Sequence, residues 1–199
     1  MPRIVFIIIA AVFVVIAATA GRSWMMDNGE VDQKQAMRVT IGGPFTLTDH
    51  TGKRVTDKDF QGKYMLVYFG YTFCPDVCPT SLSIVGDALD QLSAEELAKV
   101  TPVFISVDPE RDTPEMMASY VPNFHDKMVG LSGSLDEVKA VARAYKAYYG
   151  KVNADDPDGN YTMDHSSITY LMGPDGLYVA HFNHGTEPDV MAARLKEIL

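Results

Sequence analysis

The stretch that decides the fold is YMLVYFGYTFCPDVCP, residues 64–79. Its first part, Tyr64–Gly70, is a continuous apolar run, which is typical of a strand covered on both faces of a sheet. The stretch continues to Cys74 and Cys78, the only cysteines of the 199-residue chain, and a proline follows each of them. A buried strand that leads directly into two thiols predicts a functional site at the carboxyl edge of an α/β sheet.

Helical and strand patterns alternate along the rest of the chain. Apolar residues at helical spacing run from about Pro79 to Leu97, and Val103–Val107 is a second apolar run, so a β-α-β unit is predicted. The other predicted elements are hairpins over residues 44–56 and 168–182, and helices that start near Thr113, at Ser134 and near Pro188. We therefore expect an α/β fold, a thioredoxin-like domain with a mixed central sheet flanked by helices.

The prolines indicate where the helix after the thiols begins. A residue before proline is disfavoured in the α region, which applies to both Cys74 and Cys78. Pro79 itself fits only the first turn of a helix. We therefore expect a loop over Cys74–Val77 and a helix that starts at Cys78 or Pro79. The dipole and free amides of such a helix N-terminus favour the thiolate form of a cysteine.

The spacing of the cysteines leaves two chemistries open. A disulfide requires Cβ atoms about 3.8 Å apart, whereas a metal bound by two thiolates at about 2.3 Å each accepts a wider separation. A purely structural disulfide is disfavoured, because closing so short a loop removes little entropy from the unfolded chain. The pair is therefore expected to be redox-active or to belong to a metal site.

The N-terminal segment predicts a membrane anchor. Ile4–Ala20 is apolar apart from one threonine, and as a helix it would span roughly 25 Å of a bilayer core of about 30 Å. A cleaved signal peptide is the alternative, because residues 18–20 have an A-x-A pattern, but the apolar run is longer than a usual signal core. We expect a transmembrane helix within residues 1–26, a polar tether over 27–39 and one domain over 40–199.

The charge pattern bears on location and partners. Arg3 precedes the apolar run and acidic residues follow it, so the domain is expected on the outer side of the membrane. Such a compartment permits disulfide chemistry. The net charge of −9 argues against nucleic acid as a partner, because phosphate backbones require basic patches.

Five blocks of the sequence resemble signature blocks of the Sco/SenC family. They are GPFTL (43–47), YFGYTFCPDVCP (68–79), SVDPERDTP (106–114), VARAY (141–145) and MDHSS (163–167). The resemblance covers roughly residues 40–199. It implies a membrane-anchored thioredoxin-like domain that binds copper and helps to build the dinuclear copper centre of cytochrome c oxidase subunit II.

The resemblance also implies the ligands of the metal, which are Cys74, Cys78 and His165. Two soft thiolates and an imidazole suit copper as Cu(I) or Cu(II), although zinc accepts the same set. His165 stands where thioredoxins carry a cis-proline, and residues 164–167 contain no proline. His181 and His184 form an H-x-x-H pair, which we interpret as an edge residue and a turn residue rather than as ligands.

The same two cysteines are candidates for a redox-active catalytic pair. A thiol–disulfide reductase that keeps the copper-ligand cysteines of a target reduced is therefore the alternative function. We expect a metallochaperone first and an oxidoreductase second, whereas a peroxidase would need a sulfenic acid step. The implied partners are cytochrome c oxidase subunit II, another copper chaperone and a thiol–disulfide reductase. The implied location is the bacterial inner membrane, with a single span and the C-terminal domain in the periplasm.

Two further segments lie near the predicted site in sequence or in the fold. Asp108, Arg111 and Asp112 follow a buried strand at the same sheet edge as the thiols. They are expected either to order their loop through an ion pair or to form a docking surface. The acidic segment 153–160 is expected to be a solvated loop that leads into His165.

Overall fold

The computed structural model describes residues 40–199 except residue 155 and residues 157–160. The predicted anchor and tether, residues 1–39, lie outside the described residues, so the proposed boundaries at 26 and 39 stay predictions. Within the described part of the chain, no helix has the length and apolar character needed to cross a membrane.

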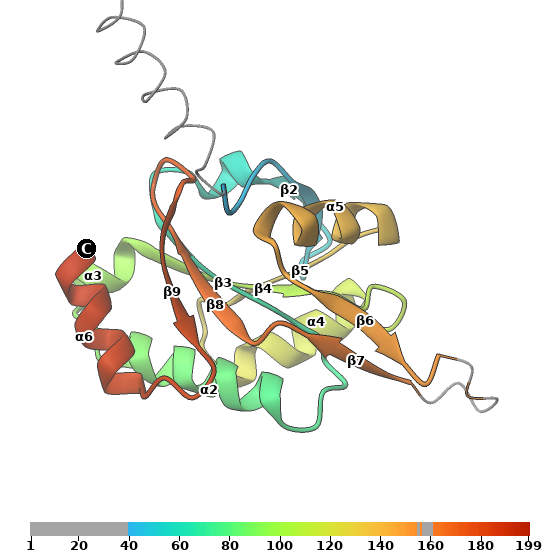
Figure 1. The fold of residues 1–199 in the computed structure, drawn as a ribbon. Coiled ribbons are helices and arrows are strands. Elements are labelled where there is room, and N and C mark those ends of the chain that lie inside the picture. The colour runs from blue at the N-terminus through green and yellow to red at the C-terminus, as the bar shows by residue number, and fades with distance from the viewer. Residues whose placement is uncertain (1–39, 155, 157–160) are drawn as a thin grey trace, which may run out of the picture. The chain divides into compact units, whose positions relative to one another are not determined.

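A seven-stranded mixed sheet forms the centre of the domain (Figure 1). Its strand order is β2-β1-β5-β4-β3-β8-β9. The central strand β3 pairs in parallel with β4 and antiparallel with β8. The strands of this sheet are β1 (Thr46–Asp49), β2 (Arg54–Thr56), β3 (Tyr64–Gly70), β4 (Val100–Ser106), β5 (Val129–Ser132), β8 (Ile168–Met172) and β9 (Tyr178–Asn183).

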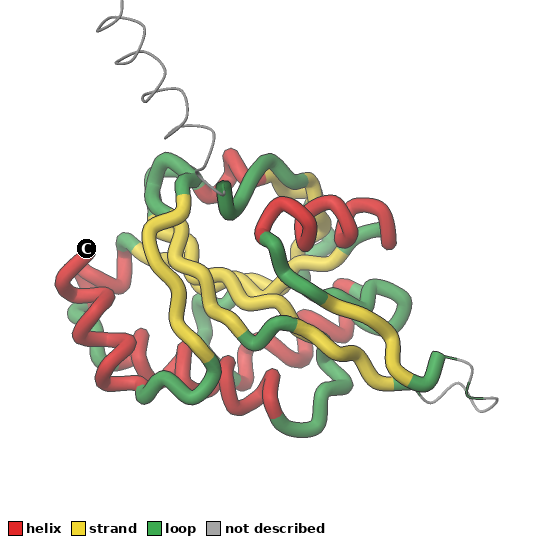
Figure 2. The backbone as a smooth tube through the Cα atoms, viewed as in Figure 1, coloured by secondary structure: helices red, strands yellow, loops and turns green. Residues whose placement is uncertain are grey.

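Helices cover both faces of this sheet. In Figures 1 and 2, α2, α4 and α6 lie on one face and α5 lies on the other. The helical segments are η1 (Asp57–Phe60), α2 (Val77–Asp90), α3 (Ala94–Ala98), α4 (Pro114–Tyr120), η2 (Val121–Asn123), α5 (Leu135–Tyr145) and α6 (Pro188–Ile198). The predicted architecture, a mixed sheet flanked by helices, is therefore confirmed.

Strand β3 is the buried centre that its apolar run predicted. Its residues from Met65 to Gly70 are all buried, because β4 and β8 flank the strand and helices cover it. The strand ends at Gly70, and the thiol stretch follows at once. The cysteines therefore lie at the carboxyl edge of the central strand, as predicted.

The single helix predicted from Pro79 to Leu97 is instead two helices. Helix α2 starts at Val77, one residue earlier than expected, and ends at Asp90. A new helix α3 follows, because the Ser93 hydroxyl accepts a hydrogen bond from the Glu96 amide and the Glu96 carboxylate accepts one from the Ser93 amide. This capping box starts a helix without disturbing the apolar spacing that suggested continuity.

A hairpin separate from the large sheet was not predicted. Strands β6 (Tyr149–Val152) and β7 (Thr162–His165) pair with each other in antiparallel register, with Tyr149 opposite His165. Their sequences, YGKV and TMDH, are short and mostly polar, so neither apolar runs nor alternation marked them as strands. His165 is therefore the last residue of β7 rather than a residue in a loop.

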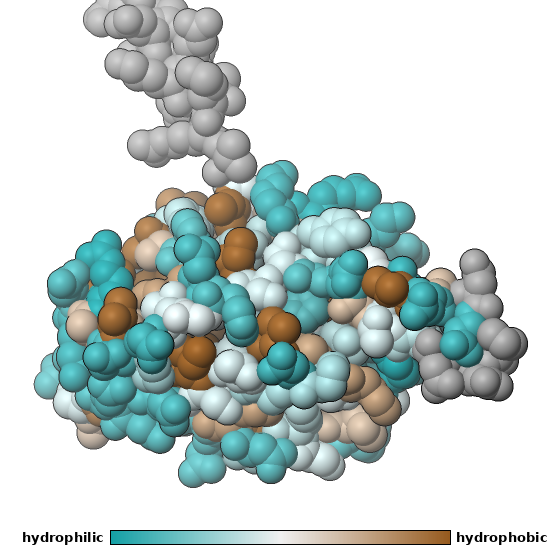
Figure 3. All heavy atoms as spheres, turned by 60° about the horizontal axis from the view of Figure 1, so that its bottom comes forward, coloured by the Kyte–Doolittle hydropathy of each residue, from teal (hydrophilic) through white to brown (hydrophobic). Residues whose placement is uncertain are grey.

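The face of the molecule in Figure 3 carries both polar and apolar residues. Figure 3 turns the underside of Figure 1 forward and shows apolar residues in separate patches among polar ones. The exposed apolar side chains of the described region include Phe73 and Met116. Together with Thr72, Ser119, Tyr120 and Asn123, these two line a shallow hollow of about 180 Å³.

Candidate metal centre

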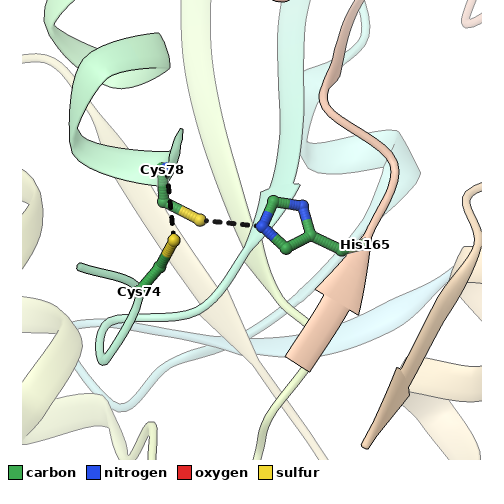
Figure 4. Close-up of side chains that lie close together, drawn as sticks. All are labelled: Cys74, Cys78 and His165. Atoms are coloured by element: carbon green, nitrogen blue, oxygen red, sulfur yellow. Dashed lines mark hydrogen bonds between the residues drawn. The ribbon is translucent and has the colours of Figure 1, made fainter. Parts of the chain in front are cut away.

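The two cysteines and His165 come from three different elements and meet at one point (Figure 4). Cys74 lies in the loop after β3, Cys78 lies in the first turn of α2, and His165 ends β7. Their sulfur and nitrogen atoms all lie within 4.8 Å of one another. Cys78 Sγ is 3.1 Å from His165 Nε2. The three side chains that the family resemblance implied as metal ligands are therefore neighbours.

The two thiols differ in exposure. Both cysteines are free, and Cys74 is half-buried, whereas Cys78 is 0% exposed. The amide of Cys78 donates a hydrogen bond to Cys74 Sγ at 3.4 Å, so the start of α2 faces the outer sulfur. An incoming molecule therefore meets Cys74 first.

Gly70 makes room for the inner sulfur. A Cβ atom at this position would lie 2.6 Å from Cys78 Sγ, and 3.0 and 3.1 Å from ring atoms of Phe104 and Tyr68. Such approaches are far inside van der Waals contact, so any larger residue would displace the sulfur or the strand. The glycine that ends β3 is therefore part of the site, which sequence reasoning missed.

Two aromatic rings and a carbonyl orient His165. The imidazole meets the rings of Tyr68 and Tyr71 edge to face, with centroid distances of 6.0 and 5.9 Å. Its Nδ1 lies 3.3 Å from the Ser166 carbonyl oxygen, which can only accept a hydrogen bond. We therefore assign the ring proton to Nδ1, which leaves the lone pair of Nε2 directed at the sulfurs.

Burial determines the protonation states of His165 and Cys78. It lowers the pKa of His165 from its ordinary value of 6.5, so the imidazole is neutral at neutral pH. It raises the pKa of Cys78 well above the ordinary thiol value. The expectation that the start of the helix favours a thiolate is therefore wrong for Cys78, because loss of solvation outweighs the helix effect. In the metal-free site, the Cys78 thiol donates to His165 Nε2.

The donor set fits a soft metal ion. Two sulfurs and one neutral imidazole nitrogen suit copper, and a metal ion would replace the thiol proton of Cys78. In the region that the structure describes, these three residues form the only cluster of three or more histidine, cysteine or acidic side chains close enough to share a metal ion.

His181 and His184 lie in other surroundings. His181 is an exposed residue of β9 whose Nδ1 lies 2.6 Å from the Tyr178 hydroxyl. His184 follows β9, and its Nδ1 lies 3.0 Å from the Ser81 hydroxyl. The interpretation of this pair as an edge residue and a turn residue therefore agrees with the structure.

The charged residues after β4 order their loop. This agrees with the first of the two predictions made for them, a loop ordered by an ion pair. Asp108 and Arg111 form an ion pair. Asp112 has a different role, because its carboxylate accepts hydrogen bonds from the Thr72 amide at 3.0 Å and the Thr72 hydroxyl at 2.6 Å. This carboxylate therefore ties the loop after β4 to the thiol loop, a contact that the sequence did not predict.

Fold and site together define a thioredoxin-like α/β protein with a Cys₂His cluster that could hold a metal ion at the carboxyl edge of its central strand. The chain belongs to the SCO1/SenC family, whose model matches residues 33–199. It is 46% identical over 164 residues to the human mitochondrial protein SCO1 homolog, an alignment that covers 82% of this chain and 54% of the relative. The chain thus spans about half the length of the curated relatives that it matches first.

Solved structures agree with this assignment. ScoI of Bradyrhizobium japonicum, solved with copper bound, is 49% identical, with a TM-score of 0.73 over 80% of this chain and 99% of the relative. ScoI of Arabidopsis thaliana, also solved with copper bound, is 45% identical, with a TM-score of 0.74 over 79% of this chain and 98% of the relative. The thioredoxin-like mixed α/β fold of Sco proteins is therefore the fold of this chain.

Proposed function

We propose that this protein is a copper chaperone. It binds one copper ion through Cys74 Sγ, Cys78 Sγ and His165 Nε2 and passes the ion to the dinuclear copper centre of cytochrome c oxidase subunit II. The observation that carries the proposal is the approach of these three atoms to within 4.8 Å of one another. Copper in the two Sco relatives described above supports the choice of metal.

Transfer starts at the exposed side of the site. Cys74 is half-buried, whereas Cys78 is fully buried. A thiolate of the receiving protein therefore replaces Cys74 first, and Cys78 and His165 release the ion afterwards. Each step exchanges one ligand for another, so the copper ion is not released into solution.

The location follows from the segment before the domain. We assign residues 1–26 to a membrane anchor and residues 27–39 to a tether, which places the domain in the periplasm beside the membrane-bound oxidase. Another copper chaperone and a thiol–disulfide reductase are the expected partners that load copper and keep the cysteines reduced.

Copper titration and transfer test the proposed function. The reduced full chain is titrated with Cu(I) and Cu(II), and the loaded protein is then mixed with the metal-free copper domain of cytochrome c oxidase subunit II. We expect one copper ion per chain, followed by its transfer to that domain. The Cys74→Ser and Cys78→Ser variants are each expected to lose tight binding. A wild-type chain that binds no copper, or that keeps it in the presence of the acceptor, would contradict the proposal.

A thiol–disulfide reductase is the second candidate, and the unequal exposure of the two thiols favours it. Cys74 would attack a target disulfide and form a mixed disulfide, and Cys78 would then displace the target thiol. After the reaction this protein holds a Cys74–Cys78 disulfide, and the target disulfide is reduced to two thiols. Because copper is not involved, this activity should survive His165→Ala in metal-free buffer. Its absence from the wild-type protein would remove this candidate.

The pH dependence of copper affinity follows from the buried thiol. Since burial raises the pKa of Cys78, this group stays protonated through the neutral range and must lose its proton when copper binds. Affinity is therefore expected to rise by about tenfold per pH unit from Cys78 alone between about pH 6.5 and 8.

His165 makes copper affinity depend more steeply on pH only under acidic conditions, because its pKa is lowered below 6.5. Competition titrations at several pH values measure both effects. The His165→Ala variant should keep the slope at neutral pH and lose the additional steepness in acid. An affinity that does not change between pH 6.5 and 8 would rule out a protonated Cys78.

A further inference from the structure

His165 reaches the sulfurs from a hairpin whose strands do not pair with the large sheet. Among the described strands, β6 and β7 pair only with each other. Side-chain contacts must therefore hold this hairpin against the thiol loop. In Figure 1 the hairpin lies beside the end of the domain where α2 begins and extends away from the sheet.

The side chain of Arg111, in the loop after β4, contacts the hairpin. Its guanidinium carbon lies 3.8 Å from the ring centroid of Tyr161. Its Nη1 donates a hydrogen bond to the Tyr161 carbonyl oxygen at 3.0 Å. Tyr161 directly precedes β7, the strand that carries His165. Arg111 therefore contacts the hairpin at the start of β7, and His165 ends the same strand.

The same guanidinium contacts the thiol loop. It lies 4.8 Å from the ring centroid of Phe73 and 5.7 Å from that of Tyr71. Phe73 directly precedes Cys74, and the ring of Tyr71 packs against the imidazole of His165. The guanidinium thus contacts Phe73, which precedes Cys74 in sequence, and Tyr71, whose ring packs on His165.

A buried carboxylate fixes this cation to the central sheet. Asp108 pairs with Arg111 Nε and accepts a hydrogen bond from the Tyr161 hydroxyl at 2.7 Å. The Asp108 side chain is only 1% exposed, and the Asp108 amide donates to the hydroxyl of Ser106 at the end of β4. Removing Arg111 would leave this carboxylate buried without a cation, which is costly.

We propose that Arg111 is a positioning residue that holds His165 at the sulfurs. Its planar guanidinium stacks on aromatic faces while its edge donates hydrogen bonds, and the ammonium of a lysine cannot do both. Without this cation the hairpin loses the ring contact and the hydrogen bond at Tyr161, and His165 is held less firmly at the sulfurs. The proposal rests on the proposed copper-binding function and names one further residue that this function requires.

The test is a double-mutant cycle that joins Arg111→Lys with His165→Ala. Lysine is chosen because it keeps a positive charge beside Asp108, whereas alanine risks unfolding the loop. Cu(I) affinity is measured for the wild-type full chain, both single variants and the double variant. Electron paramagnetic resonance of the Cu(II) forms reports whether an imidazole nitrogen is bound.

We expect Arg111→Lys to weaken copper binding about 10- to 100-fold, the range found for residues that orient metal ligands. We also expect the nitrogen signal of the imidazole to weaken in this variant. In the His165→Ala background, the same substitution should cost no more than about twofold, because residues that act through one another are not additive. The matched control is Arg54→Lys, since Arg54 also forms an arginine–carboxylate pair, with Glu137, but on an exposed surface away from the site.

Three outcomes would overturn the role of Arg111. They are an unchanged affinity in Arg111→Lys, an equal loss in both His165 backgrounds, and an equal loss in the Arg54→Lys control. A wild-type chain that binds no copper would overturn the proposed function together with this inference. Normal wild-type binding with an unaffected Arg111→Lys variant would overturn the inference alone.

Discussion

Replacing His165 with alanine is expected to weaken copper binding by more than about 100-fold. Loss of a residue that only orients a metal ligand costs up to about that factor, and loss of the ligand itself should cost more. The variant loses the nitrogen ligand and keeps both sulfurs, so copper is left with two thiols and solvent. Only a moderate loss of stability is expected, because the imidazole is half-buried and alanine leaves no charge unpaired. Competition titration with a Cu(I) chelator measures the affinity, and the Cu(II) spectrum should lose its nitrogen signal.

The matched control for this prediction is His184→Ala. Both histidines have one ring nitrogen about 3 Å from a side chain of α2, Cys78 for His165 and Ser81 for His184. His184 does not belong to the cluster of close ligand atoms, so its loss should leave copper affinity unchanged. Equal affinities of the wild-type and His165→Ala proteins would refute the three-ligand site.

Replacing Gly70 with alanine is expected to disable the site without removing a ligand. The added methyl carbon would lie 2.6 Å from Cys78 Sγ and 3.0 Å from the Phe104 ring, and β3 cannot move because β4 and β8 flank it. Such overpacking typically costs about 1–3 kcal/mol of stability. Displacement of the sulfur should also weaken copper binding. Chemical unfolding and copper titration measure the two effects.

Gly43→Ala is the control for the effect of an added methyl group. The nearest atom to a Cβ at Gly43 would be the Ala144 Cβ at 3.4 Å, an ordinary contact. This variant should keep both stability and copper affinity. A Gly70→Ala protein that binds copper as tightly as the wild type would show that the sulfur can shift without cost, and would contradict the role of Gly70.

The large sheet was predictable from the sequence where apolar periodicity was strong. The run Tyr64–Gly70 and the run Val103–Val107 identified β3 and β4, and the residues after β3 marked the edge that carries the thiols. The hairpin β6–β7 was not predictable in this way, because it is held by backbone pairing and by side chains far away in sequence. The break between α2 and α3 was also hidden, because a capping box does not alter the spacing of apolar residues.

The candidate site was predictable only in part. The spacing of Cys74 and Cys78 indicated a redox pair or a metal site, but only the family resemblance brought His165 into it. The protonation state of Cys78 was misjudged, because the sequence gives a helix start but no measure of burial. The contacts of Arg111 with Tyr161 and Phe73 join three segments that are far apart in sequence. Local sequence patterns do not predict contacts between such segments.

The separate hairpin also has a consequence for the order in which the site is assembled during folding. Both sulfurs belong to one continuous segment, from the end of β3 to the first turn of α2, whereas His165 is 87 residues further along the chain than Cys78. Local contacts form faster than contacts between distant residues. A folding chain therefore has its two thiols together before the imidazole arrives. During that interval it can be oxidised to a disulfide but cannot yet hold copper with three ligands, so chains that are still folding depend most on a reductant.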